Sequence, residues 1–228
     1  MWRRRRYQAA LMDTAHSYAT QFGWPVAPGA SLQRPWRAGG RHRADHRVDD
    51  VSCSCGNPQC PAPGGHPAHR DWQDEATIDP KVLADWWRGS ACPNLILPTG
   101  YRFDVIDAPG DVARLALRWI ASDNERIGPV AVGATDRYLF FTATSREGER
   151  PPLTAELAYY GPGQCVLAPP SSLGPLGTIC WLRAPDRRDA TLPDPAVLAH
   201  RLVDASRTLR ARWHPLALTA ERRAAVTG

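Results

Sequence analysis

Lysine and long apolar runs are nearly absent from this 228-residue sequence. Lys81 is the only lysine among 28 basic side chains, so the positive charge is carried almost entirely by arginine. This bias is typical of a GC-rich coding sequence as readily as of phosphate recognition. No apolar run approaches the ~20 residues that a membrane span requires. The basic start MWRRRRY is not followed by the apolar segment of a signal peptide, so we expect a cytoplasmic protein with no membrane partner.

The charge that is present is distributed unevenly. Residues 1–70 carry a net +6, residues 71–160 carry −5 and residues 161–228 carry +4, for a total of +5. Two basic flanks around an acidic centre suit a polyanionic partner, although a solvated surface gives the same pattern. Hydrophobic residues make up 43% of the chain, which is enough to bury the core of one large domain.

Hydrophobic periodicity and turn residues predict an α+β (α/β layered) domain with a mostly antiparallel sheet. We expect a frayed basic arm at 1–7, a main domain at 8–190, a closing helix at 191–214 and a loose tail at 215–228. Within the domain we expect helices at 7–22, 80–88 and 109–122, strands at 94–98 and 101–107, one hairpin in 128–143 and a second pair of strands in 163–185.

Residues 28–71 are polar and rich in Gly, Pro, Arg and His, which predicts a long irregular loop. Near its end, Cys53, Cys55, Cys60 and His66 follow the spacing C-x-C-x4-C-x5-H. Four such ligands suit a tetrahedral zinc ion, whose binding energy can replace the hydrophobic core that this segment lacks. We therefore predict a structural zinc loop at about 50–70. His69 competes with His66 as the fourth ligand, and free surface thiols or one disulfide are the alternatives.

The other three cysteines, Cys92, Cys165 and Cys180, lie in or beside apolar strands. We expect them to be ordinary core residues.

Four segments in sequence carry a family resemblance: YATQFGWPVAPG, CSCGNPQCPAPGGHPAHRDWQDEATIDPKVLADWW, PNLILPTGYRFDVID and CVLAPPSSLGPLGTICWL. In these segments the chain resembles the N-terminal domain of bifunctional DNA primase/polymerases, the prim-pol branch of the archaeo-eukaryotic primase superfamily. The match runs over roughly residues 8–185. Where members often have GKHP, this chain has GGHP, with Gly65 at the lysine position. The resemblance implies an RRM-like sheet with a zinc-loop insertion.

The resemblance also implies nucleotidyl transfer by two divalent ions, Mg²⁺ or Mn²⁺, held by carboxylates. The family pattern has D-x-D or D-x-E at a strand end, a histidine on the hairpin and a further aspartate. In this chain Asp107 occupies the first carboxylate position, but Pro109 occupies the second and Tyr138 occupies the histidine position. Asp104 is the nearest other strand carboxylate, yet residues three apart on a strand point to opposite faces.

The remaining candidate carboxylates are Asp111, whose position suits a helix cap, and Glu156, which is the nearest acid to the expected third position. The pattern is therefore incomplete, and we expect a degraded polymerase centre. The candidates for contact with nucleic acid or nucleotide are Arg102, Arg137 and Arg183 near strand ends, and Ser171 and Ser172 in the segment APPSS.

Three functions remain open at this stage. The first is a catalytically degenerate relative that binds DNA or nucleotide. The second is an active primase/polymerase that uses Asp107 with Asp104 or another recruited carboxylate. The third is a zinc-stabilised interaction or regulatory domain. The sequence contains no G-x-x-x-x-G-K-[ST] loop of a fused helicase, so action in replication would require partner proteins.

Overall fold

The computed structural model describes residues 2–33, 52–88, 92–145, 149–189 and 191–226. The elements in chain order are α1 (Trp2–Phe22), β1 (Ala27–Gly29), β2 (Leu32–Gln33), β3 (Ser52–Cys53), α2 (Trp72–Glu75), α3 (Pro80–Arg88), β4 (Asn94–Pro98), β5 (Asp104–Pro109), α4 (Gly110–Ser122), β6 (Val130–Val132), β7 (Arg137–Thr142), β8 (Ala158–Tyr160), β9 (Cys165–Ala168), a 3-10 turn (Gly174–Leu176), β10 (Cys180–Arg183) and α5 (Pro195–Val226).

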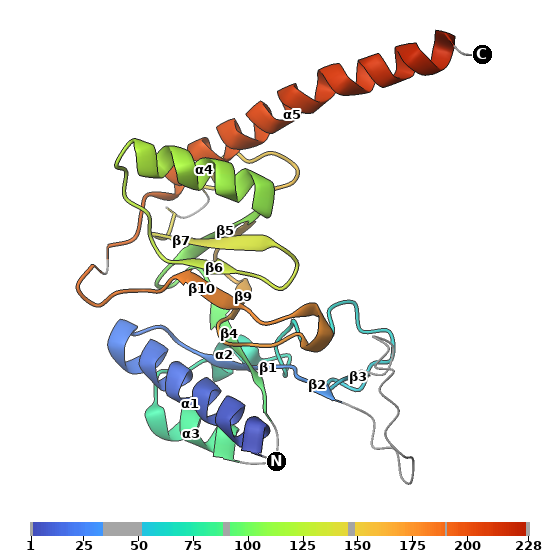
Figure 1. Ribbon diagram of the computed structural model, residues 1–228. Coiled ribbons are helices and arrows are strands. Elements are labelled where there is room, and N and C mark those ends of the chain that lie inside the picture. Colours follow the sequence, from blue (N-terminus) through green and yellow to red (C-terminus); the bar gives the residue numbers. More distant parts are fainter. Residues whose placement is uncertain (1, 34–51, 89–91, 146–148, 190, 227–228) are drawn as a thin grey trace.

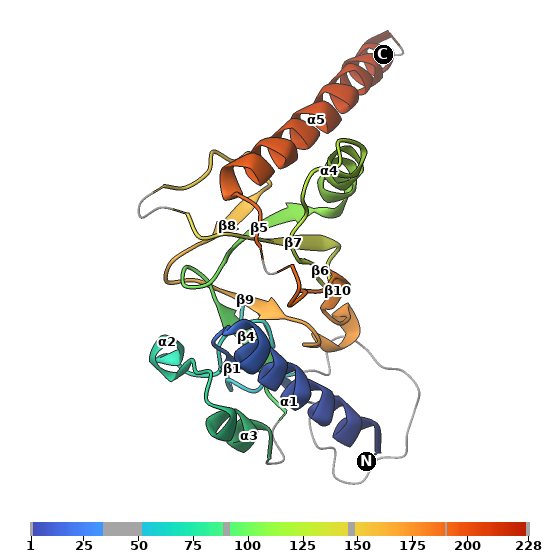
Figure 2. The ribbon, with the colours of Figure 1, turned by 90° about the vertical axis from the view of Figure 1, so that its left-hand side faces the viewer.

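The strands form three antiparallel sheets. The five-stranded sheet has the order β10-β6-β7-β5-β8, the three-stranded sheet has the order β1-β4-β9, and β2 pairs with β3. In Figures 1 and 2 the three-stranded sheet lies with α1 and α3 in one half of the molecule, and the five-stranded sheet lies with α4 and α5 in the other. Mixed helices and antiparallel sheets confirm the predicted α+β class.

Two cores cover the two faces of the five-stranded sheet. Val105, Leu139 and Phe141 point into the first core, which also takes in α1, α3 and the three-stranded sheet. Ile106 and Ala108 point into the second core, where α4 and α5 pack against the sheet and each other. Successive residues of β5 and β7 thus enter different cores, because side chains alternate along a strand.

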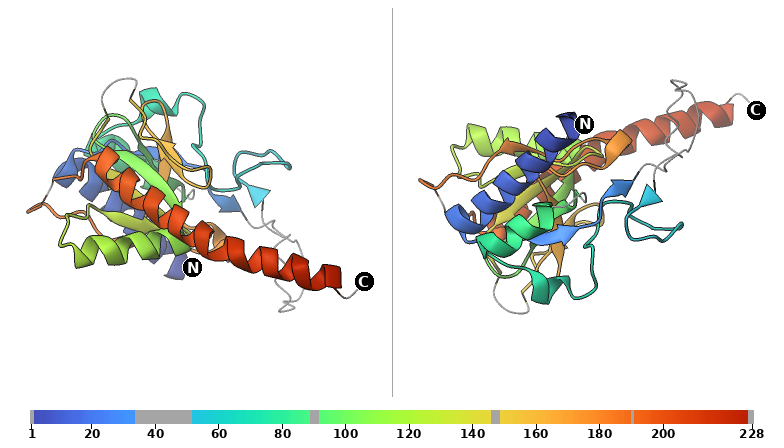
Figure 3. Two further views of the ribbon diagram at one scale, coloured as in Figure 1. Left: turned by 90° about the horizontal axis from the view of Figure 1, so that it is seen from above. Right: turned by 90° about the horizontal axis from the view of Figure 1, so that it is seen from below.

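Several predicted boundaries are wrong. α1 begins at Trp2, so residues 2–7 of the expected frayed arm are helical, and the apolar stripe of α1 (Leu11, Ala15 and Tyr18) anchors the helix in the first core. α5 continues through the expected tail to Val226 and projects away from the domain (Figure 3). Within the described residues, no helix is long and apolar enough to span a membrane.

The strands at 163–185 also differ from the prediction. β9 pairs with β4 and β10 pairs with β6, so these strands belong to different sheets and do not form a hairpin. Because β10 is an edge strand, Cys180 is exposed and is not a core residue. Cys92 and Cys165 are half-buried. Much of the predicted irregular loop, residues 34–51, lies outside the described part of the chain.

Candidate functional site

The cysteine loop brings four potential metal ligands together. The ligand atoms of Cys53, Cys55, Cys60 and His66 all lie within 4.8 Å of one another, and Cys53 Sγ is 3.2 Å from His66 Nε2. Cys53 is placed by β3, whereas the other three residues lie in turns that follow it. This cluster can hold a metal ion such as zinc.

Hydrogen bonds around the cluster favour the forms of His66 and Cys53 that can bind a cation. His66 Nδ1 is 2.6 Å from the carbonyl oxygen of Pro67, which makes Nδ1 the protonated nitrogen and leaves Nε2 free to ligate. Burial raises the pKa of Cys53, but hydrogen bonds from the Cys55 and Gly64 backbone N–H groups oppose it, and the pKa is lowered to about 6. Cys53 is therefore readily available as the thiolate, the form that binds metal.

The turn at Gly64 is required by this geometry. Gly64 has φ +73, and a Cβ there would lie 3.1 Å from Leu32 Cγ. Its N–H points to Cys53 Sγ at 3.4 Å. By contrast His69, the competing ligand, is not a member of the cluster. Its Nδ1 lies 2.7 Å from Glu75 Oε2 instead.

Asp107 lies on the face of β5 that turns toward the first core. Its side chain is 10% exposed, and its Oδ1 accepts a hydrogen bond from Arg137 Nε at 2.8 Å. Arg137 also donates to the main-chain oxygens of Asp107, at 3.4 Å, and of Glu156, at 3.1 Å. Burial raises the pKa of Asp107, although the adjacent guanidinium opposes this rise. Arg137, expected as a phosphate contact, is thus an ion-pair partner of the candidate catalytic carboxylate.

The other candidate carboxylates are used elsewhere. Asp104 is fully buried on the opposite face of β5, where its Oδ2 accepts hydrogen bonds from Ser145 N, at 2.7 Å, and from the Tyr159 hydroxyl, at 2.5 Å. The Glu156 carboxylate accepts hydrogen bonds from Ser206 and Arg210 of α5. These contacts separate both groups from Asp107.

Asp111 was expected to cap α4, but the helix begins one residue earlier and Asp111 lies in its first turn. Its Oδ1 accepts a hydrogen bond from the N–H of Val112. Among the residues that the structure describes, the only group of three or more His, Cys, Asp or Glu residues placed to share a metal ion is the cysteine cluster. No such carboxylate group surrounds Asp107 in this part of the chain.

The hairpin residue at the family's histidine position also faces away from Asp107. Tyr138 pairs with Ala108 and points into the second core, on the side of α4. The β7 side chains on Asp107's face are Arg137, Leu139 and Phe141. Because of this strand register, the residue at the family's histidine position faces away from Asp107, and Arg137 contacts the Asp107 carboxylate instead.

The predicted polar contacts lie in separate places. Ser171 is fully buried, where its hydroxyl accepts a hydrogen bond from Leu95 N at 2.8 Å. Ser172 is half-buried and lines a groove of about 1050 Å³ together with Cys55 and His69. Arg102 is exposed in the turn between β4 and β5.

Arg183 makes an ion pair with Asp189 at 3.7 Å. The structure therefore pairs Asp107 with Arg137 and places Cys55 of the cluster and Ser172 in the same groove. The candidate residues as a whole do not form one site.

Ser171 contributes to stability, so its removal is predicted to destabilise the fold. Replacing Ser171 with alanine leaves the buried Leu95 N–H without a partner, which costs about 1–3 kcal/mol. We expect a lower melting temperature in thermal unfolding, whereas Ser172→Ala is expected to change it by less. Equal effects of the two substitutions would contradict this assignment.

The Asp104 network was not found by sequence reasoning. Tyr159 and Ser145 come from β8 and the segment after β7, and the Tyr159 hydroxyl also contacts Ser145 Oγ at 2.7 Å. Burial, followed by the hydrogen bond to Asp104, raises the pKa of Tyr159 to about 12. No local motif marks this network, because its members are brought together only by strand pairing.

The match to a family model agrees with this architecture. Residues 15–195 match the family described as bifunctional DNA primase/polymerase, N-terminal. This stretch includes the cysteine cluster, Asp107 and Arg137, and the chain belongs to this family. Searches of the curated proteins and of the solved structures return no match.

Proposed function

We propose that this protein is a catalytically degenerate member of the primase/polymerase family that binds nucleic acid or nucleotide without joining nucleotides. One observation carries the proposal: the carboxylate of Asp107 is engaged by the guanidinium of Arg137 at 2.8 Å. Primase/polymerase membership connects the chain with nucleotidyl transfer, so the state of this carboxylate bears directly on activity.

A guanidinium paired with Asp107 opposes two-metal chemistry at this carboxylate. Two-metal sites hold ions about 4 Å apart and need several anionic ligands to oppose their charge. A Mg²⁺ ion held by one carboxylate keeps most of its waters and binds weakly. Arg137 already neutralises Asp107, and its positive charge repels a cation at the same position.

The binding function rests on different features. The family implies contact with nucleic acid and nucleotides. Basic segments at both ends of the chain favour a polyanion. The five-stranded sheet with α4 and α5 corresponds in our proposal to the RRM-like half of the family fold, and the groove at Ser172 is the candidate contact surface.

The metal loop has a structural role in this proposal. The four ligands of the cysteine cluster leave no open coordination position, which is typical of structural zinc. A bound zinc ion would hold the turns of residues 53–66 beside the groove at Ser172. This segment has little regular structure of its own.

A primer-extension assay tests the proposed function. With Mg²⁺ or Mn²⁺, we expect no incorporation above background by the wild type, and no difference between the wild type and Asp107→Ala. In fluorescence anisotropy, we expect the wild type to bind single-stranded DNA with an affinity that falls as salt increases.

Two outcomes would refute this assignment. Metal-dependent incorporation that is lost in Asp107→Ala would establish an active polymerase with atypical carboxylates. Absence of binding to DNA and to nucleotides would leave a zinc-stabilised interaction domain as the remaining candidate.

A further inference from the structure

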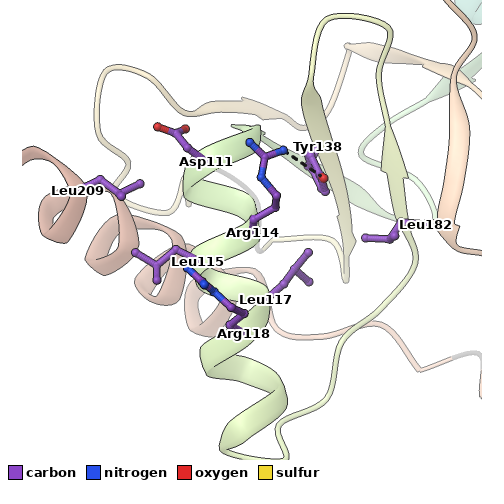
Figure 4. A pocket seen from close by; sticks show the side chains of 8 residues that line it. All are labelled: Asp111, Arg114, Leu115, Leu117, Arg118, Tyr138, Leu182 and Leu209. Atoms are coloured by element: carbon purple, nitrogen blue, oxygen red, sulfur yellow. Dashed lines mark hydrogen bonds between the residues drawn. The ribbon is translucent and has the colours of Figure 1, made fainter.

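A second concavity lies on the opposite face of the five-stranded sheet from Asp107. It has a volume of about 590 Å³, within the range of small-molecule pockets. Figure 4 shows its lining side chains around α4, with contributions from β7, β10 and α5. Its lining residues are Asp111, Arg114, Leu115, Leu117, Arg118, Tyr138, Leu182 and Leu209.

Four of the eight residues that line this pocket, which we call the α4 pocket, are leucines. Leu115 is buried and Leu117 and Leu209 are half-buried, but Leu182, on the edge strand β10, is 57% exposed. Apolar surface left in contact with water is covered favourably by an apolar ligand, at about 25 cal/mol per Å². The ligand therefore needs an apolar body.

The two arginines of the α4 pocket differ in whether they have hydrogen-bond partners within the protein. Arg114 donates to both carboxylate oxygens of Asp136, at 2.8 and 3.1 Å, and to the Tyr138 hydroxyl at 3.5 Å. Gly110 permits this arrangement, because a Cβ there would lie 2.3 Å from Asp136 Oδ2. The charge of Arg114 is thus matched and its geometry is fixed.

Arg118 is exposed, one turn along α4 from Arg114. It makes no ion pair or hydrogen bond with any residue in the described part of the chain. Its guanidinium has five N–H donors, whose planar arrangement suits a carboxylate, sulfonate or phosphate. Arg118 is therefore available to pair with an anionic group on a ligand.

We propose that the α4 pocket binds a small amphipathic anion, in which an apolar body covers the leucines and a single anionic group pairs with Arg118. This site is separate from the proposed nucleic-acid contact surface, since none of its lining residues lines the groove at Ser172. An acyl chain or an aromatic ring can supply the apolar body.

The test uses the full chain and two fluorescent probes of similar shape. Anilinonaphthalene sulfonate carries an anionic group, and phenylnaphthylamine is its neutral analogue. We expect the sulfonate to bind the wild type about tenfold more tightly than the neutral probe. Arg118→Gln is expected to remove this tenfold preference and to leave neutral-probe binding unchanged. Leu182→Asp is expected to weaken both probes and the sulfonate most.

Arg207→Gln is the matched control, since Arg207 is an exposed arginine of α5 that does not line the α4 pocket. Equal weakening of sulfonate binding by Arg207→Gln and Arg118→Gln would show general surface attraction and overturn the proposal. Unchanged binding in both Arg118→Gln and Leu182→Asp would overturn it as well. Melting temperatures within about 2 °C of the wild type establish that the variants are folded.

A competition experiment with the sulfonate probe distinguishes an acyl chain from an aromatic ring as the apolar body. Displacement of the sulfonate probe by dodecanoate indicates an acyl chain, and displacement by naphthoate indicates an aromatic acid. Displacement by inorganic phosphate at the same concentration would contradict the need for an apolar body.

Discussion

Replacing His66 with alanine is expected to remove bound zinc from the purified protein, whereas replacing His69 with alanine is expected to retain it. His66 Nε2 lies 3.2 Å from Cys53 Sγ within the four-ligand cluster, and His69 is instead paired with Glu75. The two histidines are three residues apart in the same loop. Elemental analysis should give about one zinc per chain for the wild type and for His69→Ala, and much less for His66→Ala.

The loss of zinc is also expected to unfold the loop locally. Zinc binding to small structural sites supplies about 10–16 kcal/mol of apparent free energy, and the segment from Cys53 to His66 has little regular structure to replace it. Hydrogen exchange of amides in residues 53–66 should therefore accelerate strongly in His66→Ala or after chelation. Exchange in α4 should change little, because α4 packs in the second core.

Cysteine variants provide a second comparison. Cys60→Ser removes a cluster ligand, whereas Cys180→Ser alters an exposed cysteine on the edge strand β10. Zinc should be depleted in the first variant and retained in the second. Full zinc occupancy in both His66→Ala and Cys60→Ser would refute the cluster as the metal site.

Features that depend on local spacing could be predicted from the sequence. The helix at Pro80–Arg88 begins after Asp79, whose Oδ1 accepts a hydrogen bond from Lys81 N at 2.8 Å. α5 begins after Asp194, whose Oδ1 is 2.8 Å from Ala196 N. Strand alternation correctly separated Asp104 from Asp107. Each of these predictions uses only contacts between neighbours in the chain.

Features that depend on long-range register could not be predicted. Nothing near Arg137 in the sequence indicates that it faces Asp107, because their contact follows from the pairing of Pro109 with Arg137 across β5 and β7. The exposure of Cys180 likewise follows from the position of β10 at a sheet edge. Both outcomes are set by which strands become neighbours, and strand order is not encoded in any one segment.

Arg137→Ala is expected to lower the free energy of unfolding by about 2 kcal/mol at neutral pH. Removing one partner of a buried ion pair leaves an uncompensated charge, which costs about 3–5 kcal/mol when both partners are buried. The cost is smaller here because the Arg137 side chain is 35% exposed. Denaturant unfolding measures the effect, and Arg207→Ala, an exposed arginine in α5, is the control.

The destabilisation by Arg137→Ala should depend on pH. Burial already raises the pKa of Asp107 above its ordinary value of 3.8 against the opposing effect of Arg137, so removal of the guanidinium raises this pKa further. When the folded-state pKa exceeds the unfolded one, the folded protein binds more protons between the two values, and stability falls as pH rises through that window. The loss should therefore be largest at neutral pH and should shrink as pH falls toward the unfolded pKa.

The four candidate metal ligands also protonate in acid, so the informative quantity is the stability difference between variant and wild type at each pH. The double variant Asp107→Asn/Arg137→Ala isolates the charge, because asparagine has nearly the shape of aspartate but cannot ionise. If the buried carboxylate causes the loss, the double variant should recover more than half of it at neutral pH. A pH-independent loss that Asp107→Asn does not reverse would mean that Arg137 acts through its contact with the Glu156 carbonyl instead. Asp107 would then remain open to a cation, and the argument for a degenerate centre would lose its electrostatic basis.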